Sequence, residues 1–110
     1  MWKKAVAFAD KVISITEKLE SQRKHFRLID NIEAAVVSVA VNIAEGKGRH
    51  SKKEFAQFLY IARGSLYETV TFLEIFRKKN WISSLDYDGL LTDAEEIVRM
   101  TGGLINSLRL

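Results

Sequence analysis

Apolar residues that recur at alternating steps of three and four dominate the stretch between residues 24 and 45. This spacing places every member on one face of an α-helix and is the seam pattern of helical bundles. Many of these residues are β-branched and alone would favour a strand, but the helical spacing continues through them. The chain also has no proline to break a long helix. We therefore predict a helix over residues 24–45, with a seam of Ile29, Ile32, Val36, Val39 and Ile43.

Three further segments have helical periodicity. They span residues 2–20, 51–79 and 86–108, and short connections over 46–50 and 80–85 separate the last three helices. A chain of this length usually builds one core, and short connections favour antiparallel neighbours. We predict an all-α fold, an antiparallel up-down four-helix bundle, as one domain over residues 1–110. The first helix has apolar positions at Trp2, Val6, Ala9, Val12, Ile13 and Leu19.

Turn chemistry sets two of the predicted boundaries. Gly46 is expected to end the second helix, because a glycine takes the left-handed cap conformation without strain. Ser51 is expected to be the N-cap of the third helix, and Glu54 completes a capping box. In the fourth helix, Gly102 and Gly103 each cost roughly 1 kcal/mol relative to alanine. Close approach of another helix or fraying near the terminus would account for the pair.

The third helix carries two apolar rows. A helix that is apolar over most of its circumference needs cover on most sides, and three neighbours in a small bundle leave part of it open. We therefore predict a homo-oligomer in which part of this helix is buried between subunits. One row holds Phe55, Leu59, Ala62, Leu66, Thr69, Val70, Leu73 and Phe76, and the other holds Phe58, Ile61, Ser65, Glu68, Phe72 and Ile75.

Composition excludes several kinds of protein. The chain has no cysteine and hence no disulfide, thiolate metal site or thiol nucleophile. No apolar run approaches the roughly 20 residues that span a bilayer. Residues 1–9 resemble a signal peptide faintly, but Asp10 and Lys11 end the apolar stretch, which favours the first turns of a helix. We expect a cytoplasmic protein with no membrane partner.

Charge is distributed unevenly along the chain. Residues 1–82 hold 15 Lys and Arg against 9 Asp and Glu, a net charge of +6, whereas residues 83–110 hold 2 against 5, a net charge of −3. The basic part is suited to nucleic acid or to an acidic partner.

A polar row of Ser38, Asn42 and Glu45 lies beside the apolar row of the second helix, and Ser65 and Glu68 interrupt the second apolar row of the third helix. We interpret them as a hydrogen-bonded polar network that fixes helix register or subunit docking. At about 3.6 residues per turn, Glu68 is too far along its helix to contact Asn42 within one subunit. Candidate partners of Glu68 are Tyr60, Arg63 and Tyr67.

Glu45 and Glu68 could alternatively form a catalytic pair or a metal site. A carboxylate di-metal bundle needs Glu-x-x-His motifs, and neither His25 nor His50 stands three residues after a glutamate. A hydrolase would need Ser65 on a strained elbow, and it lies mid-helix. We expect no enzymatic activity, no metal and no cofactor.

Two clusters of cationic residues flank the third helix. Near its start, backbone N–H groups and the positive end of the helix dipole also favour a phosphate. Each cluster is either a solvated helix end or a salt-sensitive contact with a nucleic-acid backbone that does not read sequence. The first cluster holds four cations and one titratable ring, at Lys47, Arg49, His50, Lys52 and Lys53, and the second is Arg77, Lys78 and Lys79.

A distinctive motif runs through residues 38–49, which include Asn42-Ile43-Ala44-Glu45-Gly46, and continues through Ser51, Phe55, Phe58, Leu59, residues 61–65 and Glu68. In this motif the middle of the chain resembles the 23S rRNA intervening-sequence protein family of small bacterial four-helix bundles. The same family includes the accessory variability determinant of diversity-generating retroelements, a pentameric ring that binds its reverse transcriptase and nucleic acid.

The resemblance implies a ring of five subunits and a role for Asn42, Glu45, Ser65 and Glu68. The net charge of +3 is lower than is typical of the retroelement relative. We expect a binding protein that contacts RNA or a ribonucleoprotein through its basic residues. The alternative is an adaptor that grips a protein such as a reverse transcriptase without touching nucleic acid.

Overall fold

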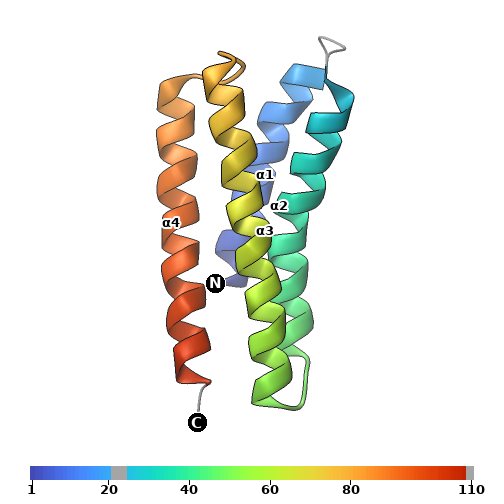
Figure 1. Cartoon of the computed structure of the whole chain (residues 1–110), viewed down its shortest axis with the longest axis vertical. Coiled ribbons are helices and arrows are strands. Elements are labelled where there is room, and N and C mark those ends of the chain that lie inside the picture. The colour runs from blue at the N-terminus through green and yellow to red at the C-terminus, as the bar shows by residue number, and fades with distance from the viewer. Residues whose placement is uncertain (21–24, 109–110) are drawn as a thin grey trace.

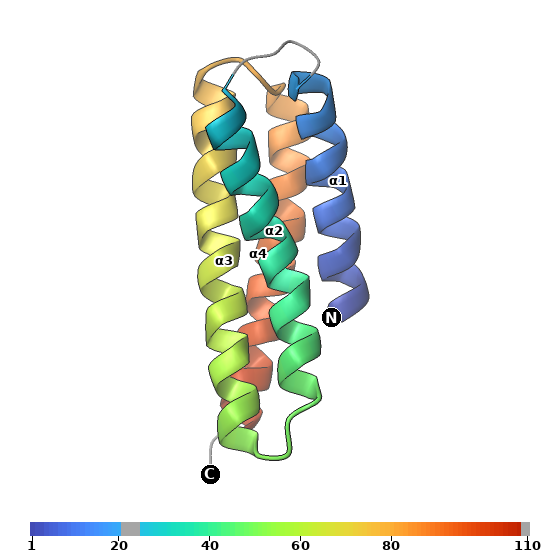
Figure 2. The ribbon, with the colours of Figure 1, turned by 90° about the vertical axis from the view of Figure 1, so that its right-hand side faces the viewer.

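Four α-helices run antiparallel and account for nearly all of the described chain (Figure 1). The computed structural model describes residues 1–20 and 25–108. Each helix packs against two neighbours, so the order around the bundle follows the chain (Figure 2). The predicted all-α up-down bundle is confirmed, as a body of 48 × 22 × 19 Å. The helices are α1 (Trp2–Glu20), α2 (Phe26–Lys47), α3 (Lys52–Lys78) and α4 (Ser84–Ser107).

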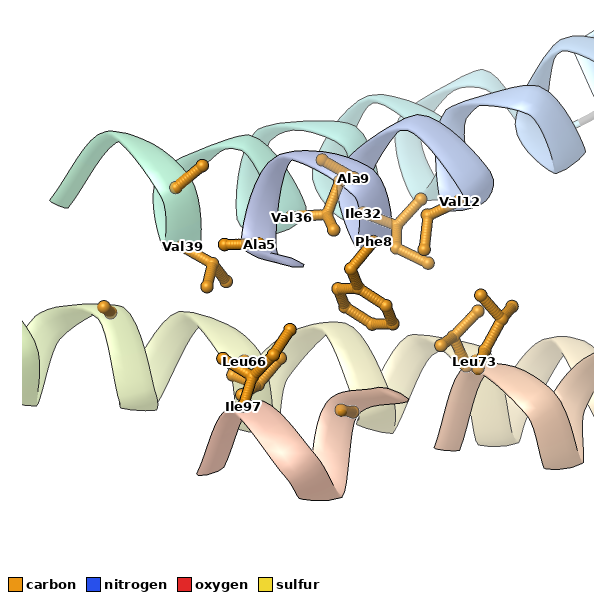
Figure 3. Close-up of a cluster of buried hydrophobic side chains, with 14 of the residues drawn as sticks. Ala5, Phe8, Ala9, Val12, Ile32, Val36, Val39, Leu66, Leu73 and Ile97 are labelled. Carbon is orange, nitrogen blue, oxygen red and sulfur yellow. The ribbon is translucent and has the colours of Figure 1, made fainter. Parts of the chain in front are cut away.

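Side chains from all four helices meet along the bundle axis, where Figure 3 shows one part of the cluster. The five seam residues predicted for α2 are each at most 1% exposed. The first row of α3 is likewise buried from Leu59 to Phe76, except that Val70 is half-buried, as is Phe55 at the start of the row. Full burial of one such large side chain contributes roughly 1.5–3 kcal/mol. The core therefore follows the helical periodicity of the sequence.

The buried face of α1 differs from the predicted row. Ala5, Phe8, Val12 and Thr16 point into the core, whereas Trp2 and Val6 lie beside that face with 47% and 42% of their surface exposed. Two of the apolar positions identified in this helix, Trp2 and Val6, therefore lie outside the core. The buried hydroxyl of Thr16 donates to the carbonyl of Ile13 and to the Glu33 carboxylate of α2, so a polar residue can occupy the core row.

The predicted glycine cap of α2 is also wrong. The helix continues to Lys47 and is capped by Gly48 at φ −81°, in the right-handed region. Gly46 is a buried residue inside the helix. A Cβ at this position would lie 2.8 Å from the Cβ of Phe58 and 2.9 Å from Cδ1 of Phe55. The glycine is thus needed for close approach of α2 and α3, not for a left-handed turn.

The start of α3 agrees with the sequence. The Ser51 hydroxyl accepts a hydrogen bond from the Glu54 amide at 3.0 Å and donates to the Glu54 carboxylate at 3.2 Å. The predicted N-cap is confirmed, whereas the second bond differs from that of a capping box, because Glu54 accepts from the Ser51 hydroxyl and not from the Ser51 amide. This cap fixes the direction in which α3 leaves the connection after α2.

At the opposite end of the bundle, His25, which directly precedes α2, meets the connection between α3 and α4. The His25 ring stacks on Trp81 with centroids 4.2 Å apart, and Trp81 packs against Phe76. The predicted first residue of the second helix, residue 24, lies outside the described residues. Helix α4 starts two residues earlier than predicted, because the Ser83 hydroxyl caps it by accepting from the Asp86 amide at 3.0 Å.

The glycine pair of α4 sits in regular helix. A Cβ at Gly102 or Gly103 would meet no atom within 4 Å, and the helix continues to Ser107. Within this chain, neither close approach nor fraying explains the pair. None of the four described helices has an apolar stretch that would carry it through a lipid bilayer.

Candidate binding surfaces

A small polar cluster joins α2 to α3 on the outer side of the core. The Ser38 and Ser65 hydroxyls lie 2.8 Å apart. The Asn42 side-chain amide donates to the Ser38 carbonyl at 2.8 Å and to the Ser38 hydroxyl at 2.9 Å. All three side chains are half-buried. The structure therefore brings together three of the five residues of the predicted polar network.

The two carboxylates of that predicted network lie elsewhere. Glu45 is exposed and pairs with Arg49 at 3.3 Å, and Glu68 is exposed without a hydrogen bond or ion pair to any described residue. Neither Arg63 nor Tyr67 forms a hydrogen bond or ion pair with Glu68. Instead, the Arg63 guanidinium lies 5.1 Å from the centre of the Tyr60 ring, and Tyr67 lines a groove on the side of α4.

The second apolar row of α3 is only partly covered by the rest of the chain. Ile61 is 51% exposed and Ile75 is 39% exposed, with the exposed Glu68 between them at seven-residue intervals. Phe58 and Phe72 are half-buried. Residues seven apart share a helix face, so one side of α3 presents apolar surface to solvent.

The first basic cluster occupies the tip of the α2–α3 hairpin. Lys47, His50, Lys52 and Lys53 are exposed and form no ion pair with any described residue. Arg49 pairs with Glu45 and lies over the Phe58 ring at 4.6 Å. We call Lys47, Arg49, His50, Lys52 and Lys53 the tip cluster. It therefore presents several cations that no neighbouring acid neutralises.

Two of the three cations of the second basic cluster pair with Glu74. Arg77 donates two hydrogen bonds to its carboxylate, at 2.6 and 3.1 Å, and the Lys78 ammonium lies 4.0 Å away. Hydrogen bonds from Arg77 and from Tyr87 lower the pKa of Glu74 to about 2. The hydrogen bond to Glu74 in turn raises the pKa of Tyr87. Of this cluster, Lys79 alone has no acidic partner among the described residues.

An apolar groove between α1 and α2 was not predicted. It has a volume of about 720 Å3 and is lined by Trp2, Val6, Val41 and Ala44, with Arg49 at one end. Val41 is 48% exposed. A second apolar row of α2, at Ala34, Val37, Val41 and Ala44, is the sequence signal that could have revealed it.

Across the part of the chain that the structure describes, no three His, Asp or Glu side chains gather where they could share a metal ion. Glu45 and Glu68 therefore belong to no such cluster. The outer surface of the described bundle carries apolar side chains in some places and basic side chains in others.

The fold is a small antiparallel four-helix bundle whose α2–α3 hairpin exposes both apolar and basic side chains. The chain belongs to the family described as 23S rRNA-intervening sequence protein, whose family model matches residues 1–103. This confirms the family indicated by residues 38–68, whereas the link to the retroelement protein stays a prediction.

A solved structure supports the same fold. A protein with unknown function from the S23 ribosomal protein family of Bacteroides thetaiotaomicron, determined at 1.70 Å, superposes with a TM-score of 0.90 at 25% identity. The match covers 94% of this chain and 96% of that one. No curated protein matches the sequence.

Proposed function

We propose that this chain is a non-enzymatic binding protein that contacts RNA phosphates through the tip cluster. The observation that carries this proposal is the contrast between the two basic clusters. Lys47, Lys52 and Lys53 have no acidic partner among the described residues, whereas Arg77 and Lys78 of the other cluster both pair with Glu74. Unpaired ammonium groups attract phosphates without first breaking an ion pair.

The local backbone supports the same ligand. Lys52 and Lys53 occupy the first turn of α3, where the helix dipole disfavours cations and favours anions. Cations in that position add to the attraction for a phosphate. Binding of this kind is electrostatic, weakens with salt and does not read sequence. An RNA ligand is consistent with a cytoplasmic protein.

We further propose that several copies assemble and repeat the tip cluster around a ring. The partly exposed row of Ile61 and Ile75 supports burial of α3 between subunits, and the family resemblance implies five copies. Linking several weak phosphate sites raises overall affinity without any new contact. A ring would therefore compensate for the modest charge of each subunit.

The α1–α2 groove supports a second candidate function, that of a protein adaptor. Exposed apolar surface around Trp2 and Val41 is suited to an apolar side chain from another protein. As an adaptor, the chain would bind a protein such as a reverse transcriptase and make no contact with RNA itself. RNA titration separates the two functions.

The test compares two double variants that remove the same number of charges. Lys47→Gln with Lys52→Gln alters the tip, and Lys78→Gln with Lys79→Gln alters the opposite end of α3. Binding of an RNA duplex of about 16 base pairs is measured at about 50 mM salt, where phosphate contacts are strong. We expect the tip variant to lose more affinity than the control. Absence of binding by the unmodified protein would remove the RNA function and leave the adaptor.

A further inference from the structure

A second groove lies between α3 and α4, which run side by side (Figure 1). Its volume is about 260 Å3, below the roughly 300–1,000 Å3 of pockets for drug-sized ligands. This space is better suited to one flat ring than to a helix of a protein partner. The lining includes Tyr67, Val70, Leu91, Val98, Glu95 and Arg99.

An exposed aromatic ring borders this groove. Tyr67 is 54% exposed, and Tyr60 lies seven residues earlier on the same face of α3, roughly 10 Å away along the helix axis. The Arg63 guanidinium lies 5.1 Å from the centre of the Tyr60 ring. Exposed tyrosine and arginine planes are the surfaces on which proteins stack unpaired bases.

A row of basic and aromatic residues runs along α3 from the tip cluster to the groove. Lys53 precedes Tyr60 by seven residues, so a lysine and two tyrosines follow one another along one face of α3. At the groove itself, Arg99 is exposed and forms no ion pair with any described residue, although Glu95 is one turn away. A nucleic-acid strand leaving the tip would meet positive charge and aromatic rings in alternation.

We infer that the α3–α4 groove takes an unstacked base of single-stranded RNA, with Tyr67 as its stacking surface. Glu95 accepts a hydrogen bond from an amino group on the base edge, and Arg99 donates to a base acceptor or to a phosphate. The inference rests on the proposed RNA function and adds a preference for unpaired strands. A duplex cannot use the groove, because its bases stay stacked on one another.

The experiment compares two RNAs and two substitutions at one exposed position. An oligoadenylate of about 12 nucleotides, within the usual site sizes of single-strand binders, tests the groove, and the RNA duplex used for the tip serves as its reference. Tyr67→Leu keeps apolar contact but removes the aromatic ring, and Tyr67→Phe keeps the ring. Dissociation constants are measured at low salt, and the mass of each variant is checked by sedimentation.

We expect Tyr67→Leu to weaken oligoadenylate binding roughly fivefold or more, since one stacked base contributes about 1–3 kcal/mol. Duplex binding should change little, and Tyr67→Phe should behave as the unmodified protein. Unchanged oligoadenylate binding by Tyr67→Leu would overturn the inference, while loss of binding in the tip variant would still uphold the proposed function. An equal loss of affinity for both RNAs, or a change in subunit number, would show that Tyr67 does not act by stacking on an unpaired base, and would also overturn the inference. If the unmodified protein binds neither RNA, both proposals fall together.

Discussion

Gly46 of α2 and Phe58 of α3 approach so closely that a methyl group on the glycine would lie 2.8 Å from the phenylalanine Cβ. The atom in the way is next to the backbone, so it cannot swing aside as the end of a flexible side chain would. The close packing of α2 against α3 therefore requires a glycine at position 46, because any larger side chain would collide with Phe58.

Gly46→Ala should destabilise the protein by about 1–3 kcal/mol, the usual range for overpacking a tight core. The gain in helix propensity of up to about 1 kcal/mol reduces the loss but does not reverse it. Urea denaturation measures the change. The matched control is Gly103→Ala, where a Cβ would meet no atom within 4 Å, and this variant should be stabilised by about 0.5–1 kcal/mol. Equal effects at the two glycines would contradict the close approach.

Acid should weaken the contact between the end of α3 and the start of α4. The folded-state pKa of Glu74 is about 2, below its ordinary value of 4.5, because Arg77 and Tyr87 donate to its carboxylate. A lowered pKa stabilises the fold above the unfolded-state value, and this contribution is lost as pH falls from about 4.5 toward 2. Glu74→Gln should therefore show a smaller loss of stability over that range.

Thermal unfolding between neutral pH and pH 2 measures this dependence. Glu17→Gln, at an exposed carboxylate of α1, is the control and should retain the acid sensitivity of the unmodified protein. An unchanged pH profile for Glu74→Gln would show that its ion pair with Arg77 contributes nothing to folding.

The hydroxyl pair of Ser38 and Ser65 should be energetically coupled. Ser38→Ala also removes an acceptor of Asn42, so it should cost more than Ser65→Ala, each loss being on the order of 0.5–2 kcal/mol. A double-mutant cycle measured by urea denaturation gives the interaction free energy between the two serines, which we expect to be about 0.5–1.5 kcal/mol. Strict additivity would indicate that the two hydroxyls do not interact.

The exposed apolar row of α3 should determine the number of subunits. Ile61→Glu places a charge where half of the side chain is already exposed, so the single chain should still fold. Sedimentation velocity should show an oligomer for the unmodified protein and a smaller species for Ile61→Glu, with the same helix content by circular dichroism. Lys79→Glu, at the far end of α3, should leave the assembly intact. A well-folded monomer before any substitution would contradict the ring.

Helical periodicity predicted the fold because the core of this bundle follows it closely. Ile32 and Leu66 are buried where their rows place them, and Ser51 and Glu54 form the cap that their spacing indicates. Periodicity did not predict which residues are buried where one helix carries two apolar rows. Trp2 belongs to one apolar row of α1, but the residues buried in the core are Ala5 and Phe8 of the neighbouring row.

The role of Gly46 could not be predicted, because its constraint comes from Phe55 and Phe58 of another helix. The pairing of Arg77 and Lys78 with Glu74 could have been predicted, since Glu74 precedes them by three and four residues. The α3–α4 groove depends on side chains from two helices, and a single sequence row does not indicate it.

The slope of RNA affinity against salt tests the central claim most directly. Each phosphate contact contributes about 0.7–0.9 to the slope of log affinity against log salt concentration. Lys47→Gln with Lys52→Gln should therefore reduce the slope by about 1.4–1.8 per subunit in contact with RNA, and Lys78→Gln with Lys79→Gln should leave it nearly unchanged. Equal slopes for the tip variant and the unmodified protein would contradict the assignment of the tip cluster as the RNA contact.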